Sequence, residues 1–185
     1  SVAETALMLI LECSRNVTVL HNTWVNDFYK AKLKVRKNTV NGKTLGLIGC
    51  GNIGSRVAKR ALAFEMNVLA YDPYLPASAF PDGVEVVRDL DRIFTESDYV
   101  SLHAPNTPVT HDMVTMDRLK MMKPSAFLIN TARGGLVVEQ DLYEACRTGV
   151  IAGAGLDAIR QEPVDPANPL LTLDNVIIYP HIGGN

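Results

Sequence analysis

Short apolar runs alternate with amphipathic segments along most of this chain. Seven runs are rich in aliphatic side chains and end at glycine, proline or polar residues, as is typical of buried strands. These predicted strands span residues 44–49, 67–71, 83–87, 98–103, 125–130, 151–157 and 175–180. Segments with helical spacing lie between them, at residues 52–64, 88–95, 117–121 and 139–147. Alternating strands and helices predict an α/β fold, a doubly wound parallel sheet of about seven strands with helices on both faces.

The residues before the first strand follow a different pattern. Residues 1–17 are predicted to form one helix with an apolar face, in which Ser1 and Glu4 have the spacing of a capping box. Residues 21–43 show no clear period. Trp24 and Phe28 in this segment could anchor a partner chain or pack into the core. The same segment holds five basic residues whose simplest interpretation is a solvated surface: Lys30, Lys32, Lys34, Arg36 and Lys37.

The composition narrows the class of protein. With 185 residues, 47% of them hydrophobic and 21% charged, the chain is typical of a soluble globular domain. The net charge of −2 predicts neither a nucleic-acid partner nor a membrane partner. The three cysteines are scattered, so we expect no metal site and no disulfide. The sequence shows no signal peptide and no apolar run long enough to span a bilayer, and we therefore expect a cytoplasmic protein.

A glycine-rich loop follows the first predicted strand. Gly49, Gly51 and Gly54 form the pattern G-x-G-x-x-G between a strand and a helix. The first glycine permits a tight turn, the second lets the backbone approach a pyrophosphate, and the third lets the helix pack against the strand. The amides of Asn52 and Ile53 then lie at the helix N-terminus, where the helix dipole favours an anion. The pattern predicts a dinucleotide site of the Rossmann type.

An acidic residue ends the second predicted strand. Asp72 lies 18 residues after Gly54, where a carboxylate can bond both ribose hydroxyls of an adenosine. The same carboxylate would repel a 2′-phosphate and no arginine follows it, so NAD is favoured over NADP. The alternative is an ordinary turn aspartate before Pro73.

Charged side chains follow the last three predicted strands. They are Arg133, then Asp157 with Glu162, and finally His181. Ligands of open α/β sheets bind at the carboxyl ends of the strands. The arginine could hold a carboxylate, the histidine could transfer a proton, and the glutamate could orient the imidazole and favour its protonated form. Each residue alone could be an ordinary loop residue, but together they indicate hydride chemistry at a carbonyl.

The chain resembles the D-isomer-specific 2-hydroxyacid dehydrogenases, and among them the phosphoglycerate dehydrogenase branch. The resemblance rests on "GLIGCGNIG", "SLHAPNTPVTHDMV", "LINTARGGLVVEQDLYEA", "AGAGLDAIRQEP" and "PHIGG", which occur in the family's order. It implies NAD-dependent interconversion of a D-2-hydroxy acid and a 2-oxo acid, with Arg133, Glu162 and His181 as the catalytic residues. It also implies a cofactor site formed by Gly49, Gly51, Asn52, Ile53, Gly54, Asp72, Pro105, Thr110, Thr131, Ala132, Arg133, Asp157, His181 and Gly183.

The chain departs from the family pattern in sequence and in length. Ile159 and Arg160 replace a phenylalanine and an acidic residue, and Val138 replaces a common aspartate, which we interpret as a minor surface change. Family members are longer, because the cofactor domain is inserted into a second domain. Residues 1–185 are therefore expected to be the NAD-binding domain alone, with both flanks of the substrate-binding domain missing. Such a chain should bind NAD but turn over poorly, and His181 near its end should be poorly held.

Two functions remain open at this point. The first is the NAD-dependent oxidoreductase acting on a small 2-hydroxy or 2-oxo acid. The second is an NAD-sensing, corepressor-like scaffold of the same fold, in which the cofactor stabilises a dimer that recruits partners. Either function is compatible with a homodimer of the full-length protein, because the family pairs its chains through the helix that links the two domains.

Overall fold

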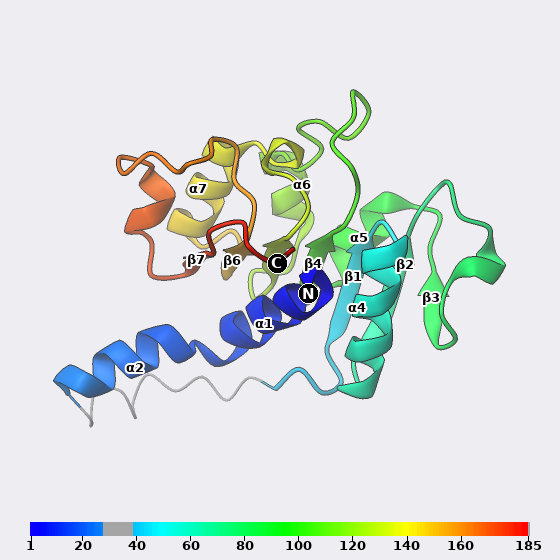
Figure 1. Cartoon of the computed structure of the whole chain (residues 1–185), viewed down its shortest axis with the longest axis horizontal. Helices are drawn as coiled ribbons and strands as arrows, with labels where there is room; N and C mark the ends of the chain where they lie inside the picture. Colours follow the sequence, from blue (N-terminus) through cyan, green and yellow to red (C-terminus); the bar gives the residue numbers. More distant parts are fainter. Residues whose placement is uncertain (28–38, 185) are drawn as a thin grey trace.

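The computed structural model describes residues 1–27 and 39–184, and its centre is one parallel sheet (Figure 1). The strand order is β3-β2-β1-β4-β5-β6-β7, and all neighbouring strands are parallel. The order reverses between β1 and β4, which is where open α/β sheets bind ligands. The predicted seven-stranded, doubly wound sheet is therefore confirmed. The strands are β1 (Thr44–Ile48), β2 (Asn67–Tyr71), β3 (Val84–Val86), β4 (Tyr99–Leu102), β5 (Phe127–Asn130), β6 (Gly153–Leu156) and β7 (Val176–Ile178).

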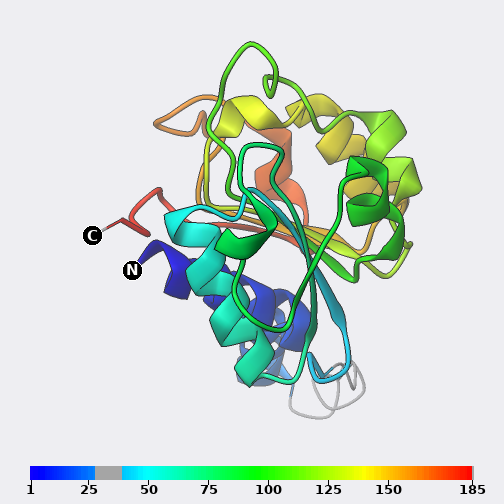
Figure 2. The ribbon, with the colours of Figure 1, turned by 90° about the vertical axis from the view of Figure 1, so that its right-hand side faces the viewer.

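Helices cover both faces of this sheet, as Figure 2 shows. One face packs against α1 (Val2–Arg15) and α4 (Asn52–Ala63). The other face packs against α5 (Leu90–Glu96), α6 (Met116–Met121) and α7 (Glu139–Thr148). Successive strand residues point to opposite faces, so every second residue enters each core. In β1, Leu45 and Leu47 join the first core and Ile48 joins the second.

The N-terminal region differs from its prediction. The first helix ends at Arg15, because Asn16 adopts a left-handed conformation with φ of 53° and donates its amide to the Glu12 carbonyl over 2.6 Å. A second helix, α2 (Val17–Asn26), follows where we predicted irregular structure, so that prediction is wrong. Trp24 and Val25 on α2 are exposed, and a helix without a buried stripe leaves no period in the sequence. Phe28 and the five basic residues from Lys30 to Lys37 lie outside the described residues.

Two residues at helix N-caps also differ from what the sequence analysis expected. Ser1 is the N-cap of α1 but makes no side-chain cap bond within the described residues, and the Glu4 carboxylate lies 3.7 Å from the terminal amine instead. Val138 is the half-buried N-cap residue of α7, so the interpretation as a minor surface change is wrong. An aspartate there could accept an amide of the first turn, which valine cannot do.

The helices of the described ranges are all too short or too polar to cross a bilayer.

Candidate active site

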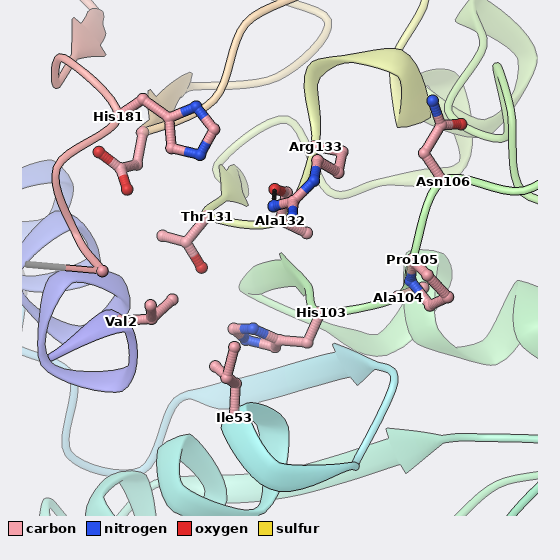
Figure 3. Close-up of a pocket in the computed structure, with 12 residues that line it drawn as sticks. Val2, Ile53, His103, Ala104, Pro105, Asn106, Thr131, Ala132, Arg133 and His181 are labelled. Atoms are coloured by element: carbon pink, nitrogen blue, oxygen red, sulfur yellow. Dashed lines mark hydrogen bonds between the residues drawn. The ribbon is translucent and has the colours of Figure 1, made fainter.

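A cleft of about 880 Å³ lies at the carboxyl edge of the sheet (Figure 3). Its lining comes from the start of α1, the first turn of α4 and the segments that follow β4, β5, β6 and β7. The lining residues are Val2, Ile53, His103, Ala104, Pro105, Asn106, Thr131, Ala132, Arg133, Asp157, His181 and Gly184. Residues that are far apart in the sequence thus surround one cleft, because the carboxyl ends of parallel strands lie at the same edge of the sheet.

The glycine-rich loop is tightly packed at Gly49 and Gly54 but leaves open space at Gly51. Gly49 has φ of 93°, and a Cβ there would lie 2.8 Å from the His103 carbonyl group at the end of β4. A Cβ on Gly54 would lie 2.2 Å from the oxygen of Gly49, the last residue of the strand we predicted, so the helix approaches the end of that strand as closely as we expected. A Cβ on Gly51 would meet no described atom within 4 Å. The open side of the loop therefore leaves space for a ligand at Gly51.

Asp72 at the end of β2 holds this loop in place. Its Oδ2 accepts a hydrogen bond from the Cys50 amide at 2.9 Å, and its Oδ1 accepts one from the Tyr74 amide at 3.1 Å. The second bond is the local turn that we weighed as the alternative role for this residue. A carboxylate can accept about four hydrogen bonds, so these two contacts leave it able to accept ribose hydroxyls as well.

Several groups around the cleft fit a bound dinucleotide. The Thr131 hydroxyl is buried and has no hydrogen-bond partner among the described residues, although it borders the cleft. Buried hydroxyls are normally bonded, so this one points to a missing partner. Near Ile53, which borders the cleft, the N-cap of α4 is Gly51, which has no side chain to bond the first-turn amides. Free amides at a helix N-terminus suit a phosphate.

The segment after β7 is fastened to the end of β6. Asp157 is 3% exposed, and its two carboxylate oxygens accept the amides of Ile182 at 3.2 Å and Gly183 at 3.1 Å. A Cβ on Gly183 would lie 2.5 Å from the same carboxylate, so only glycine allows this approach. His181 has φ of 53°, a left-handed conformation that is uncommon outside glycine and is often found at functional sites.

His181 and Glu162 form a hydrogen-bonded pair beside the cleft. Nδ1 of His181 lies 2.6 Å from Oε2 of Glu162, and Oε1 of Glu162 accepts the Ile159 amide at 3.2 Å. The imidazole faces the cleft, which leaves Nε2 as the ring atom that can reach a ligand (Figure 3). The expectation that His181 is poorly held is wrong, because Asp157 and Glu162 fix its backbone segment and its ring.

Arg133 reaches the same cleft from the turn after β5. Asn130 shapes this turn: its Nδ2 donates to the Arg133 carbonyl at 3.0 Å, and its Oδ1 accepts the Ala132 amide at 3.0 Å. The guanidinium of Arg133 is exposed and donates to the Ala132 carbonyl at 2.7 Å. Its remaining donors are therefore available to an anion in the cleft. Asn130 is 1% exposed, and no pattern in the sequence distinguished it from an ordinary last residue of a strand.

The predicted cofactor residues do not all border the cleft. Ile53, Pro105, Thr131, Ala132, Arg133, Asp157 and His181 border it, whereas Gly49, Gly51, Asn52, Gly54, Asp72, Thr110 and Gly183 do not. Thr110 shapes the loop after β4, because its hydroxyl accepts the Thr107 amide and donates to the Pro105 carbonyl. We missed Val2, His103, Ala104 and Asn106. The rule that ligands bind at strand ends could have found the three that follow β4.

Comparison with known proteins identifies the family. Residues 7–183 match the family described as D-isomer specific 2-hydroxyacid dehydrogenase, NAD binding domain. The chain belongs to this family. Its sheet, glycine-rich loop and cleft are thus those of a family NAD-binding domain, and the predicted resemblance is confirmed.

Similar proteins include several members of the 2-hydroxyacid dehydrogenase family. The D-3-phosphoglycerate dehydrogenase of Methanocaldococcus jannaschii is 42% identical over all of this chain and 35% of its own length. The hydroxypyruvate reductase of Thermotoga maritima is 44% identical over all of this chain and 60% of its own length. The crystal structure of the Aquifex aeolicus D-lactate dehydrogenase with NAD and lactic acid is 35% identical with a TM-score of 0.86. That match covers 98% of this chain and 59% of the solved chain.

We expect His103 to make the stability of this domain depend on pH. Its Nε2 lies 2.9 Å from the buried Ser101 hydroxyl, and burial lowers the pKa of His103 to about 4 from an ordinary value of 6.5. At a pH between these two pKa values, His103 binds a proton in the unfolded chain but not in the folded chain. We therefore expect the free energy of unfolding to fall by on the order of 2 kcal/mol as pH drops from 6.5 to 4, and to lose nothing from this group above pH 6.5.

Urea unfolding over this pH range measures the effect. The His103→Gln variant should have a smaller slope of unfolding free energy against pH than the parent. His111→Gln is the matched control, because His111 is exposed, and it should keep the parental slope. Equal slopes for His103→Gln and the parent would show that His103 takes up its proton equally in both states.

Proposed function

We propose that this chain is the cofactor-binding domain of an NAD-dependent oxidoreductase that interconverts a D-2-hydroxy acid and a 2-oxo acid. The His181–Glu162 pair at the cleft carries the proposal, since it presents Nε2 of a carboxylate-oriented imidazole to a space that Arg133 also reaches. The chain spans 35% and 60% of the length of the two curated relatives described above. We therefore propose that a second, substrate-binding domain outside residues 1–185 completes the site.

Each charged side chain then has a separate task. Arg133 would hold the substrate carboxylate in a bidentate contact and draw electron density from the adjacent carbonyl. Nε2 of His181 would give its proton to the carbonyl oxygen during reduction and take it back during oxidation. Glu162 would keep the ring in place through Nδ1 and stabilise the charge that appears on it. The dinucleotide supplies or accepts the hydride at the substrate carbon.

The remaining residues would hold the cofactor. The amides of Asn52 and Ile53 at the start of α4, above Gly51, would bind the pyrophosphate. Asp72 would bond the adenosine ribose and disfavour a 2′-phosphate, which supports NAD over NADP. Asp157 would hold the nicotinamide carboxamide, and the Thr131 hydroxyl, which has no partner among the described residues, borders the same cleft. Pro105, Thr110, Ala132 and Gly183 would shape the surrounding walls, together with Gly49 and Gly54.

Turnover of 2-oxo acids by the intact protein tests the proposed function. We expect loss of NADH absorbance with phosphohydroxypyruvate, hydroxypyruvate or glyoxylate, and chiral chromatography should identify D product wherever the product is chiral. The two curated relatives named above support the first two substrates. NADPH should be a much poorer donor. Binding of NADH without turnover of any 2-oxo acid would contradict the proposed oxidoreductase function. The names of the relatives give no support to the corepressor hypothesis.

We also propose that the intact protein is a cytoplasmic homodimer. The support for a dimer is α2, which projects from the sheet and carries Trp24 and Val25 at 56% and 73% exposure (Figure 1). The support for a reducing compartment is that the cysteines are buried free thiols. Sedimentation should give a dimer for the parent and more monomer for Val25→Asp. A parent that sediments as a monomer would contradict the proposal.

A further inference from the structure

Arg160 lies two residues before Glu162, in the loop after β6. Its guanidinium forms an ion pair with Asp112 and donates Nη2 to the Val137 carbonyl at 2.7 Å. Asp112 belongs to the loop after β4, and Val137 to the turn after β5 that also carries Arg133. One side chain of the loop after β6 thus contacts two other segments that surround the cleft.

The backbone of Arg160 is held at the same place. Its amide donates to Oε2 of Glu139 at 3.0 Å, and Oε1 of Glu139 accepts Nδ2 of Asn168 at 2.7 Å. The loop also lies directly on the Arg133 turn, because a Cβ on Gly134 would come within 2.0 Å of the Ile159 carbonyl group. The Arg160 side chain therefore adds to an existing close contact between the backbones of its own loop and of the Arg133 turn.

The other two segments are already joined by backbone hydrogen bonds. The Asp112 amide donates to Gly135, the Val114 amide to Leu136, and the Val138 amide to Val114, at 2.9–3.0 Å. These two segments form one unit, to which Arg160 fastens the third. Removing the guanidinium would leave the loop held by the bond from its own amide to Glu139 and by the contact at Gly134, and would loosen its outer end.

Glu162 depends directly on this part of the loop. Oε1 of Glu162 accepts the amide of Ile159, the residue before Arg160, while Oε2 contacts His181. We infer that Arg160 is a positioning residue for the Glu162–His181 pair, acting through its contacts with Asp112 and Val137. The inference rests on the proposed function. Arg160 and Asp112 are 39% and 40% exposed, so their pairing adds little stability and its effect is on geometry.

Kinetics of the intact protein tests the inference. Arg160→Gln should lower kcat about tenfold, because small displacements of catalytic groups are costly, and should leave the Kd for NADH unchanged. Asp112→Asn should have a similar effect. In a Glu162→Gln background, Arg160→Gln should cause no further loss, since the path it acts through is already removed. Additive losses, or a parental kcat in Arg160→Gln, would overturn the inference.

A second measurement needs no turnover. Hydrogen exchange at the Ile159 and Arg160 amides should quicken in Arg160→Gln, and the side-chain nitrogen NMR signals of His181 should shift. Arg92→Gln is the matched control, because Arg92 on α5 pairs with Glu85 and Glu96 at a similar exposure but away from the cleft. Exchange and signals equal to those of the parent would overturn the inference. Absence of turnover in the parent would instead count against the proposed function, and the exchange data would still decide the role of Arg160.

Discussion

Replacement of His181 by asparagine should lower kcat of the intact protein by about 10³-fold, the usual contribution of a positioned proton donor. Asparagine cannot carry the proton that Nε2 of His181 presents to the cleft. The Kd for NADH should change much less, because the backbone of the segment is held by Asp157 through two amide bonds. Steady-state kinetics and fluorescence titration with NADH measure the two quantities separately.

Two comparison variants define the role of the histidine. Glu162→Gln should lose about 10²-fold in kcat, since a neutral amide can still contact Nδ1 but no longer stabilises a charged ring. His111→Asn removes an exposed histidine that does not line the cleft, and it should keep the parental rate. A kcat for His181→Asn within tenfold of the parent would exclude His181 as the proton donor.

Gly54→Ala should reduce the free energy of unfolding by about 3 kcal/mol, the upper part of the range for forced overpacking. The added Cβ would lie 2.2 Å from the Gly49 oxygen and 3.0 Å from the Gly49 carbonyl carbon. Both are backbone atoms of a loop that Asp72 holds from the other side, so neither can move aside cheaply. Urea unfolding of the parent and the variant measures the loss.

Gly51→Ala is the matched control in the same loop. Its Cβ would meet no described atom within 4 Å, so the free energy of unfolding should change by less than about 1 kcal/mol. The methyl group would instead occupy the space in which the backbone approaches a pyrophosphate, and the affinity for NADH should fall by about tenfold or more. Equal unfolding energies for the two variants would contradict the close packing at Gly54. An unchanged NADH affinity in Gly51→Ala would contradict the placement of the pyrophosphate.

The fold could be predicted largely from local patterns. A buried parallel strand is a short apolar run, and a helix that packs on a sheet has a 3.6-residue period, so both can be recognised without knowing their neighbours. Six of the seven strands are one to three residues shorter than predicted, and β2 has the predicted bounds. The residues lost lie at both ends, as in β5, which ends at Asn130 as predicted but begins two residues later, at Phe127. The same reasoning failed at α2, where Trp24 and Val25 face solvent and no buried stripe exists to produce a period.

Contacts inside the site were harder to predict, because they join residues distant in the sequence. The strand-end rule brought Arg133, Asp157 and His181 to one edge of the sheet. It could not show that Asp157 accepts the amides of Ile182 and Gly183, 25 and 26 residues away. We also did not name His103, which follows β4 and lines the cleft, and the family resemblance placed Thr110 at a cleft that this residue does not border.

The sequence by itself determined the class of fold, the dinucleotide loop and the set of charged residues, because each depends on the order and spacing of side chains along one or two elements. Only the tertiary structure decided which of these groups touch. Glu162 and His181 are 19 residues apart, and Arg160 and Asp112 are 48 apart. Whether such groups meet depends on the lengths and paths of the loops between parallel strands. Those paths are set by backbone hydrogen bonds and by close approaches at glycines such as Gly134 and Gly183, which no local pattern encodes.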